Sequence, residues 1–100
     1  MIRHKFNSVK TSIDDIKFSS KKEAKRYVEL KHLKEIGDVL FFLRQVRFDL
    51  PAGIKYVCDF LVFWASGDVT VEDVKGLKLP MYVLKKKQIE TLYPFKITEI

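Results

Sequence analysis

Two carboxylates and a lysine lie close together in segments that otherwise resemble strands. Asp59 follows the run Tyr-Val-Cys, and Asp73 stands two residues before Lys75 in the run Val-Glu-Asp-Val-Lys-Gly. Side chains alternate between the two faces of a strand, so Asp73 and Lys75 share a face and Glu72 lies on the other. If the two strands pair through a turn at 65–68, all three groups lie at the end remote from that turn. The sequence therefore predicts two carboxylates and a lysine at one edge of a sheet.

Such a trio suits the hydrolysis of a phosphodiester bond. Two carboxylates can hold Mg²⁺, with Mn²⁺ as a substitute, and leave coordination sites for water and a phosphate oxygen. A lysine beside them can position the attacking water or offset the charge of the transition state. The alternative is that Asp73 and Lys75 form a surface ion pair, which contributes only ~0–1 kcal/mol. The metal is favoured because charges within strands as apolar as residues 60–65 need a partner or a metal.

The N-terminal third of the chain predicts a hairpin followed by a helix. Apolar and polar residues alternate on both sides of a turn, which predicts a β-hairpin over 10–18. Ser20 and Glu23 fit a capping box, and a period near 3.6 then predicts a helix over about 20–36. Glu23 is therefore expected in the first turn of this helix.

Three strands with short connections follow, which predicts an antiparallel meander. The strands are expected at 39–50, 55–64 and 69–75. Regular alternation along the middle strand would place Val57, Asp59 and Leu61 on one face.

A second helix and a last strand complete the expected fold. The helix should begin near Pro80 and end before Pro94. Its apolar stripe is expected to comprise Met81, Leu84, Gln88 or Ile89, and Leu92. Residues 95–100 read as a short strand that follows a crossover and pairs parallel to the sheet. The expected α/β (α+β) fold is a mixed sheet flanked by helices, in one domain spanning residues 1–100 of which 1–9 are flexible.

The charge of the chain favours a polyanionic partner. Lys and Arg number 19 against 13 Asp and Glu, which gives a net charge of +6. Basic groups release counterions from a phosphate backbone, so DNA is the expected partner. The residues expected to contact DNA backbone phosphates are Lys21, Lys22, Lys25 and Arg26 on the first helix, and Lys85 and Lys86 on the second. Lys86 is the member of the run 85–87 expected to grip the scissile phosphate, although a solvated helix face is the usual explanation of such a run.

The sequence also predicts a compartment. Its longest apolar run is far shorter than the ~20 residues that a membrane-spanning helix needs. The basic N-terminus lacks the apolar stretch of a secretory signal. The single cysteine, Cys58, cannot form an internal disulfide and is expected to be a buried small hydrophobe. A cytoplasmic protein is expected, in the host cytoplasm if a phage encodes it.

The runs FSSKKEAKRYVELKHL, YVCDF, VEDVKG and YVLKKKQIETLYP, in this order, resemble a known family. The chain looks like the small phage proteins of the PD-(D/E)xK nuclease superfamily. Its layout is similar to that of phage endonuclease I-type Holliday junction resolvases. The resemblance covers about residues 10–100, and it implies a restriction-endonuclease-like core of α-β-β-β-α-β order.

The resemblance also implies roles for individual residues. Asp59 would be the metal-binding aspartate of the PD motif, and Asp73 and Lys75 would supply the acidic residue and the lysine of (D/E)xK. Glu23 matches the acidic residue that many members contribute from the first helix, to the metal or to a water. Two departures stand out, because Cys58 replaces a frequent proline and Asp73 replaces the commoner Glu.

Gln45 is a further candidate, because similar nucleases often place a polar residue near the site from this strand. The alternative is a buried, hydrogen-bonded glutamine. Together these features predict a metal-dependent DNA endonuclease that acts on branched, recombination or replication DNA of a phage. Two alternatives stay open, a non-catalytic DNA-binding accessory protein on the same fold and a protein-interaction domain. A homodimer would place one site on each DNA strand.

Overall fold

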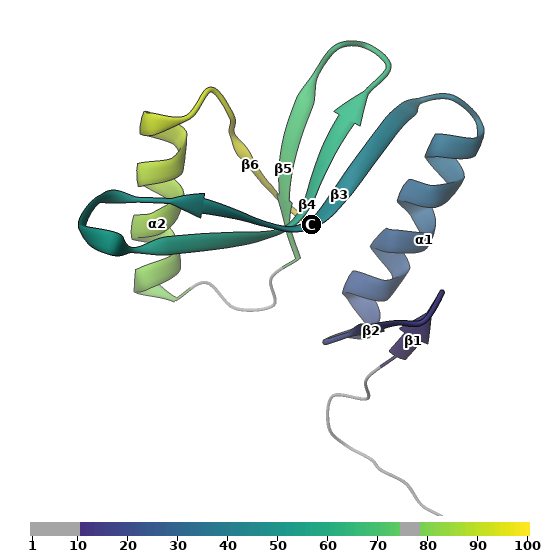
Figure 1. Cartoon of the computed structure of the whole chain (residues 1–100), viewed down its shortest axis with the longest axis horizontal. Coiled ribbons are helices and arrows are strands. Elements are labelled where there is room, and N and C mark those ends of the chain that lie inside the picture. Colours follow the sequence, from purple (N-terminus) through teal and green to yellow (C-terminus); the bar gives the residue numbers. More distant parts are fainter. Residues whose placement is uncertain (1–10, 75–78) are drawn as a thin grey trace, which may run out of the picture.

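The computed structural model describes residues 11–74 and 79–100. It contains an N-terminal hairpin, a helix, a four-stranded mixed sheet and a second helix (Figure 1), which confirms the expected α+β fold and order of elements. Residues 1–9 and Lys75 lie outside the described residues, so what the sequence predicts for them stays a prediction. In the described parts of the chain, no helix is long and apolar enough to cross a membrane.

The N-terminal hairpin consists of β1 (Thr11–Ile13) and β2 (Ile16–Phe18), which pair antiparallel. Asp14 and Asp15 form its two-residue turn with φ angles of 53° and 63°. Short polar side chains tolerate this left-handed conformation, and two such residues in succession match the twist of a hairpin.

Helix α1 (Lys21–Glu35) begins where the capping pattern predicts. The hydroxyl of the N-cap residue Ser20 accepts a hydrogen bond from the backbone N–H of Glu23 at 3.1 Å. The helix buries one face through Glu23, Ala24, Tyr27 and Leu30. Val28, in the same helix, is 48% exposed.

The four-stranded sheet has the order β3-β4-β5-β6. Its strands are β3 (Val39–Asp49), β4 (Lys55–Trp64), β5 (Val69–Asp73) and β6 (Ile97–Glu99). The first three form the expected antiparallel meander, and β6 pairs parallel to β5 after the crossover. β5 ends at Asp73, short of the predicted 69–75.

Helix α2 (Pro80–Leu92) contacts the sheet through a narrower stripe than the sequence predicts. Its buried residues are Tyr82 and Ile89, seven positions apart and so on one face. Three members of the predicted stripe are exposed, namely Met81, Leu84 and Leu92. The predicted apolar stripe of α2 was therefore wrong apart from Ile89. The helix packs on the sheet through Tyr82, which the predicted stripe did not include.

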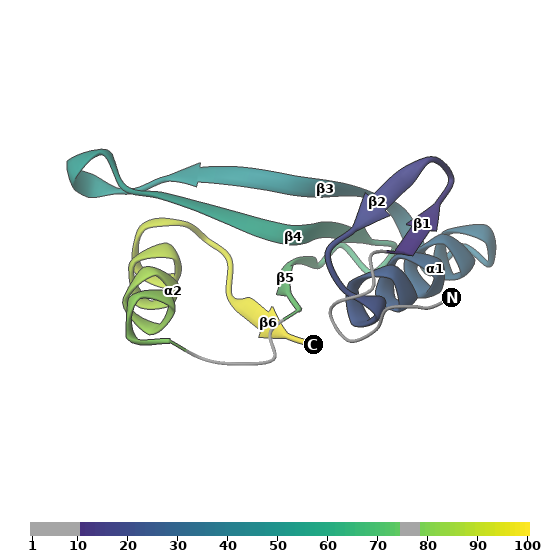
Figure 2. The same ribbon diagram turned by 90° about the horizontal axis from the view of Figure 1, so that it is seen from below.

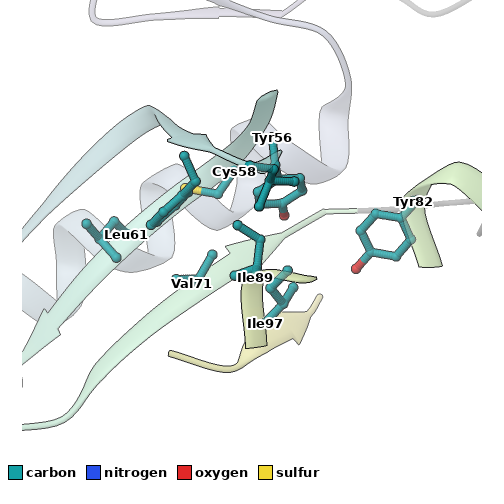
Figure 3. Close-up of a cluster of buried hydrophobic side chains, with 9 residues drawn as sticks. Tyr56, Cys58, Leu61, Val71, Tyr82, Ile89 and Ile97 are labelled. Carbon is teal, nitrogen blue, oxygen red and sulfur yellow. The ribbon is translucent and has the colours of Figure 1, made fainter. Parts of the chain in front are cut away.

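The buried side chains form two clusters, one under each helix, and the two helices lie at opposite ends of the β3–β4 ribbon (Figure 2). The α1 cluster comprises Phe18, Ala24, Tyr27, Leu30, Val39, Phe60 and Val62. The α2 cluster comprises Phe48, Leu50, Tyr56, Cys58, Leu61, Val71, Tyr82, Ile89 and Ile97, of which Figure 3 labels seven. Cys58 is fully buried there, as predicted.

Strands β3 and β4 exchange faces at the same point along their ladder. Phe42 packs on the α1 cluster and Val46 on the α2 cluster, although residues four apart in a regular strand share a face. Cys58 and Phe60, two residues apart, likewise belong to different clusters. Gln45 lies at this reversal with φ of 54°, inside the left-handed region. A left-handed residue interrupts the regular extended conformation of the strand that contains it.

The reversal corrects one expectation about β4. Regular alternation would place Val57, Asp59 and Leu61 on one face, but Leu61 is buried in the α2 cluster whereas Val57 is 47% exposed. The prediction failed because it assumed an unbroken period of two.

Candidate active site

Asp59 and Asp73 are cross-strand neighbours. The antiparallel register pairs Phe60 with Glu72, and one position further from the connecting turn the side chains of Asp59 and Asp73 lie within hydrogen-bonding reach of each other. Opposed residues in such a ladder have Cβ atoms only ~5 Å apart. The structure thus brings together the two carboxylates that the sequence places at this edge.

The Asp59 carboxyl group has a raised pKa. Burial raises the pKa of Asp59 to about 6, and the nearby carboxylates of Asp73 and Glu23 add to the rise. The backbone N–H of Val74 donates to Asp59 Oδ2 at 2.7 Å and partly offsets it. Burial and the two neighbouring carboxylates therefore disfavour the charged form of Asp59.

Asp73 is enclosed, with 1% of its surface exposed. The hydroxyl of Tyr56 donates a hydrogen bond to Asp73 Oδ2. Burial and this bond to a carboxylate raise the pKa of Tyr56 well above its usual range, so the hydroxyl keeps its proton and remains a donor. Tyr56 thereby fixes one oxygen of Asp73.

Glu23 reaches the same region from the first turn of α1. Its side chain is buried, and its Oε1 accepts a hydrogen bond from the Ser19 hydroxyl at 3.0 Å. Its Oε2 accepts from Gln45 Nε2 at 3.2 Å and lies 3.6 Å from Arg44 Nη2. Only the backbone N–H of Glu23 serves the helix cap. The capping role and the site role expected of Glu23 are therefore compatible.

Gln45 links two of these carboxylates. Its Nε2 donates to Glu23 Oε2 at 3.2 Å and lies 3.5 Å from Asp59 Oδ1. The residue is exposed, so it is not the buried glutamine of the alternative interpretation. Its left-handed backbone costs roughly 1–3 kcal/mol, and such strain concentrates at functional sites. The strained residue is thus the one that bridges Glu23 and Asp59.

Glu72 lies on the opposite face from Asp73, as alternation predicts. It is 1% exposed and pairs with Arg26 through two hydrogen bonds of 2.7 and 2.6 Å. Arg26 also forms an ion pair with Glu29 at 3.3 Å. Arg26, a predicted DNA contact, is therefore engaged within the chain.

The predicted DNA-contacting lysines lie on both helices. Lys21, Lys22 and Lys25 are exposed at the start of α1, the helix end that carries Glu23. Lys85 and Lys86 are half-buried on α2. Lys86 Nζ lies 3.4 Å from Glu99 Oε2. Because Glu99 pairs with Asp73 across β5 and β6, Lys86 is held near the candidate site.

Three neighbours of the site were missing from the sequence-based prediction, namely Tyr56, Tyr82 and Glu99. The Tyr82 hydroxyl donates to Glu99 Oε2 at 2.9 Å. The register that sets Glu99 beside Asp73 follows a long crossover, and sequence pattern does not fix such a register. A weak sequence signal could have indicated that Tyr56 is buried, because it stands two residues before Cys58 in the same strand and should share its face.

The donor set suits a hard divalent cation. Among the described residues, no three His, Cys, Asp or Glu side chains already form a metal-binding group. Mg²⁺, however, commonly takes one or two protein carboxylates and keeps several waters. Asp59 and Asp73 offer oxygen ligands only, and the Asp73 carboxylate adds to the effect of burial in raising the pKa of Asp59. The pair fits Mg²⁺.

Comparison with known proteins identifies a family. Residues 3–99 match the family model described as "Protein of unknown function (DUF1064)". The chain belongs to the DUF1064 family. No curated protein and no solved structure matches the chain significantly. DUF1064 membership assigns no activity and gives no link to PD-(D/E)xK nucleases, so that resemblance stays a prediction.

Proposed function

We propose that this DUF1064 protein is a Mg²⁺-dependent endodeoxyribonuclease of the PD-(D/E)xK type. The observation that carries the proposal is the close pair Asp59 and Asp73, in which burial and the neighbouring Asp73 carboxylate raise the pKa of Asp59 to about 6. Glu23 adjoins this pair through the amide of Gln45. Carboxylate oxygens that lie beside the solvent-exposed Gln45 are suited to metal-assisted hydrolysis of a phosphodiester bond.

The residues take the following roles in this proposal. Asp59 and Asp73 hold Mg²⁺ or Mn²⁺, and Glu23 orients a water or adds a ligand. A bound divalent cation supplies a water of lowered pKa and offsets the charge that develops on the phosphate. Gln45 keeps the Glu23 and Asp59 carboxylates oriented. Lys75, which the sequence alone places near Asp73, would stabilise the transition state.

The proposed substrate is DNA. The chain carries a net charge of +6, and the exposed Lys21, Lys22 and Lys25 surround the helix end that bears Glu23. Lysines at such positions would contact backbone phosphates and hold the duplex in register without reading its sequence. Branched recombination or replication DNA of a phage is proposed from the resemblance of the sequence, and a homodimer would cut both strands.

Cleavage of a small DNA panel tests the proposal. Linear duplex, single strand, flap and four-way junction are incubated with Mg²⁺, Mn²⁺ or EDTA. Cutting is expected with either metal and not with EDTA. It should disappear in Asp59→Asn and Lys75→Ala but persist in Asp38→Asn, which removes an exposed carboxylate just before β3. The absence of cutting from every substrate with both metals contradicts the proposal.

One observation favours a second candidate, a non-catalytic DNA-binding protein. Asp73 is 1% exposed and hydrogen-bonded to Tyr56, as a purely structural carboxylate would be. This candidate predicts salt-dependent DNA binding that Asp59→Asn leaves unchanged and that no metal converts to cleavage.

A further inference from the structure

A groove of about 580 Å³ lies between the N-terminal hairpin, α1 and β3, on the α1 side of the candidate site. We name it the α1–β3 groove. Its lining includes Ile16, Tyr27, Lys31, Lys34, Phe42 and Arg44. The groove has the size of a small-molecule or single-residue binding site. The candidate active site leaves it unused.

The lining combines aromatic rings with basic side chains. Tyr27 and Phe42 meet edge to face, with ring centroids 5.8 Å apart, and Phe42 is the more exposed of the two. Three cations, Lys31, Lys34 and Arg44, contrast with a single acidic lining residue, Glu35. Lys31 is partly neutralised, because it forms an ion pair with Asp14. An apolar floor with a basic rim is complementary to a ligand that is aromatic at one end and anionic at the other.

Arg44 connects the groove to the candidate site. Its Nη2 lies 3.6 Å from Glu23 Oε2, and its guanidinium lies over the Phe18 ring at 4.7 Å. Its Nε is buried and has no hydrogen-bond partner among the described residues. This guanidinium therefore retains donor capacity at the point where the groove meets the carboxylates. An anion at that point would lie between groove and site.

We propose that the α1–β3 groove binds an unpaired nucleotide of a DNA strand. The base would stack against Phe42, with the buried Tyr27 beside it in the groove floor, and a flanking phosphate would contact Lys34 and Arg44. Proteins that bind single strands combine aromatic stacking surfaces with cations in this way, and every base offers a π-face. A base within a duplex cannot offer that face. The proposal deepens the proposed function and rests on it for one consequence, a preference for substrates with an unpaired strand beside the cleavage site.

Binding measured without cleavage tests the groove. Fluorescence anisotropy is followed in EDTA at ~50 mM salt, where electrostatic affinity is strong. The probes are labelled oligo-dT, an abasic strand of equal length and a blunt duplex. Stacking contributes ~1–3 kcal/mol per base, so oligo-dT should bind about 5-fold or more tighter than the abasic strand. Phe42→Leu should abolish this preference.

A charge-matched pair of variants completes the experiment. Lys34→Glu and Lys96→Glu make the same charge change on exposed residues, but only Lys34 lines the groove. Lys34→Glu is expected to weaken binding of oligo-dT at least about 5-fold more than Lys96→Glu does. Equal losses in the two variants, or equal affinity of the wild type for oligo-dT and the abasic strand, would overturn the proposal. Lys34→Glu keeps the test decisive if Phe42→Leu does not fold.

The proposed nucleotide binding in the groove and the proposed nuclease function can be contradicted separately. A protein that binds oligo-dT through Phe42 and Lys34 but cuts nothing contradicts only the proposed function. A protein that cuts flaps and duplexes equally well, with wild-type rates in Lys34→Glu, contradicts only the groove.

Discussion

Replacing Asp59 by Asn should stabilise the protein at neutral and higher pH. The pKa of Asp59 rises from its ordinary 3.8 to about 6 in the folded state. Each pKa unit corresponds to ~1.4 kcal/mol, which sets an upper limit of ~3 kcal/mol on the cost of the charge. Asp59 is only half-buried, so solvent screening should reduce this cost to ~1–2 kcal/mol. An asparagine oxygen can still accept the Val74 N–H, so the variant keeps that hydrogen bond.

The sign of the pH dependence follows from proton linkage. Below about pH 4, Asp59 is protonated in both the folded and the unfolded chain and costs nothing. Between about pH 4 and pH 6 the unfolded chain loses this proton first, so the free energy of unfolding of the wild type falls relative to that of the variant. Above the folded pKa of about 6 the full difference is present.

Urea unfolding in EDTA, followed by the fluorescence of Trp64 at about pH 4, 5, 6, 7 and 8, measures this difference. Asp59→Asn should match the wild type at about pH 4 and exceed it by ~1–2 kcal/mol at about pH 8. Asp38→Asn, which removes an exposed carboxylate, controls for the change in net charge. A difference between wild type and Asp59→Asn that stays constant across this range would refute the reasoning, as would a variant less stable at about pH 8.

Three further outcomes are expected. Millimolar Mg²⁺ should raise the thermal midpoint of the wild type but not of Asp59→Asn, because a ligand stabilises only the state that binds it; equal shifts in differential scanning fluorimetry would contradict the metal site. Glu72→Gln should lower the free energy of unfolding by about 3 kcal/mol, because it removes the buried partner of the Arg26 charge and leaves only the exposed Glu29 to pair with it; an unchanged urea midpoint would show that the Arg26–Glu72 ion pair contributes little. Gln45→Gly should be at least as stable as the wild type, because glycine adopts φ of 54° without strain, while its cleavage rate falls with the loss of the amide bridge; urea unfolding and the flap assay measure the two effects, and loss of stability would contradict this reading.

Much of the fold follows from local chemistry that the sequence displays. The Ser20 cap, the turn at 14–15 and the two-residue alternation of the strands fixed where the elements begin. The facing of Asp59 and Asp73 was also predictable, because a short connecting turn determines an antiparallel register. The pair is therefore the part of the site that sequence reasoning reached without any family resemblance.

The face reversal could not be predicted in the same way. A left-handed residue in a strand is usually a glycine, whose presence can be read from the sequence, but Gln45 has a side chain that gives no such indication. The stripe of α2 failed for a related reason. Which face of a helix is buried depends on where the sheet lies, and here Tyr82 is buried while the aliphatic Leu84 is exposed.

The candidate site draws on two packing units, the α1 cluster with its helix and the α2 cluster with its helix. Glu23 comes from the unit of α1, whereas Tyr56 and the Asp73 oxygen that it fixes belong with the unit of α2. Asp59 lies between these two units, close to carboxylates of both. Local opening of either unit, such as amide hydrogen exchange detects, would therefore dismantle the carboxylate set while the other unit stays intact. The candidate site exists only when both units are folded, which couples its chemistry to the integrity of the whole domain.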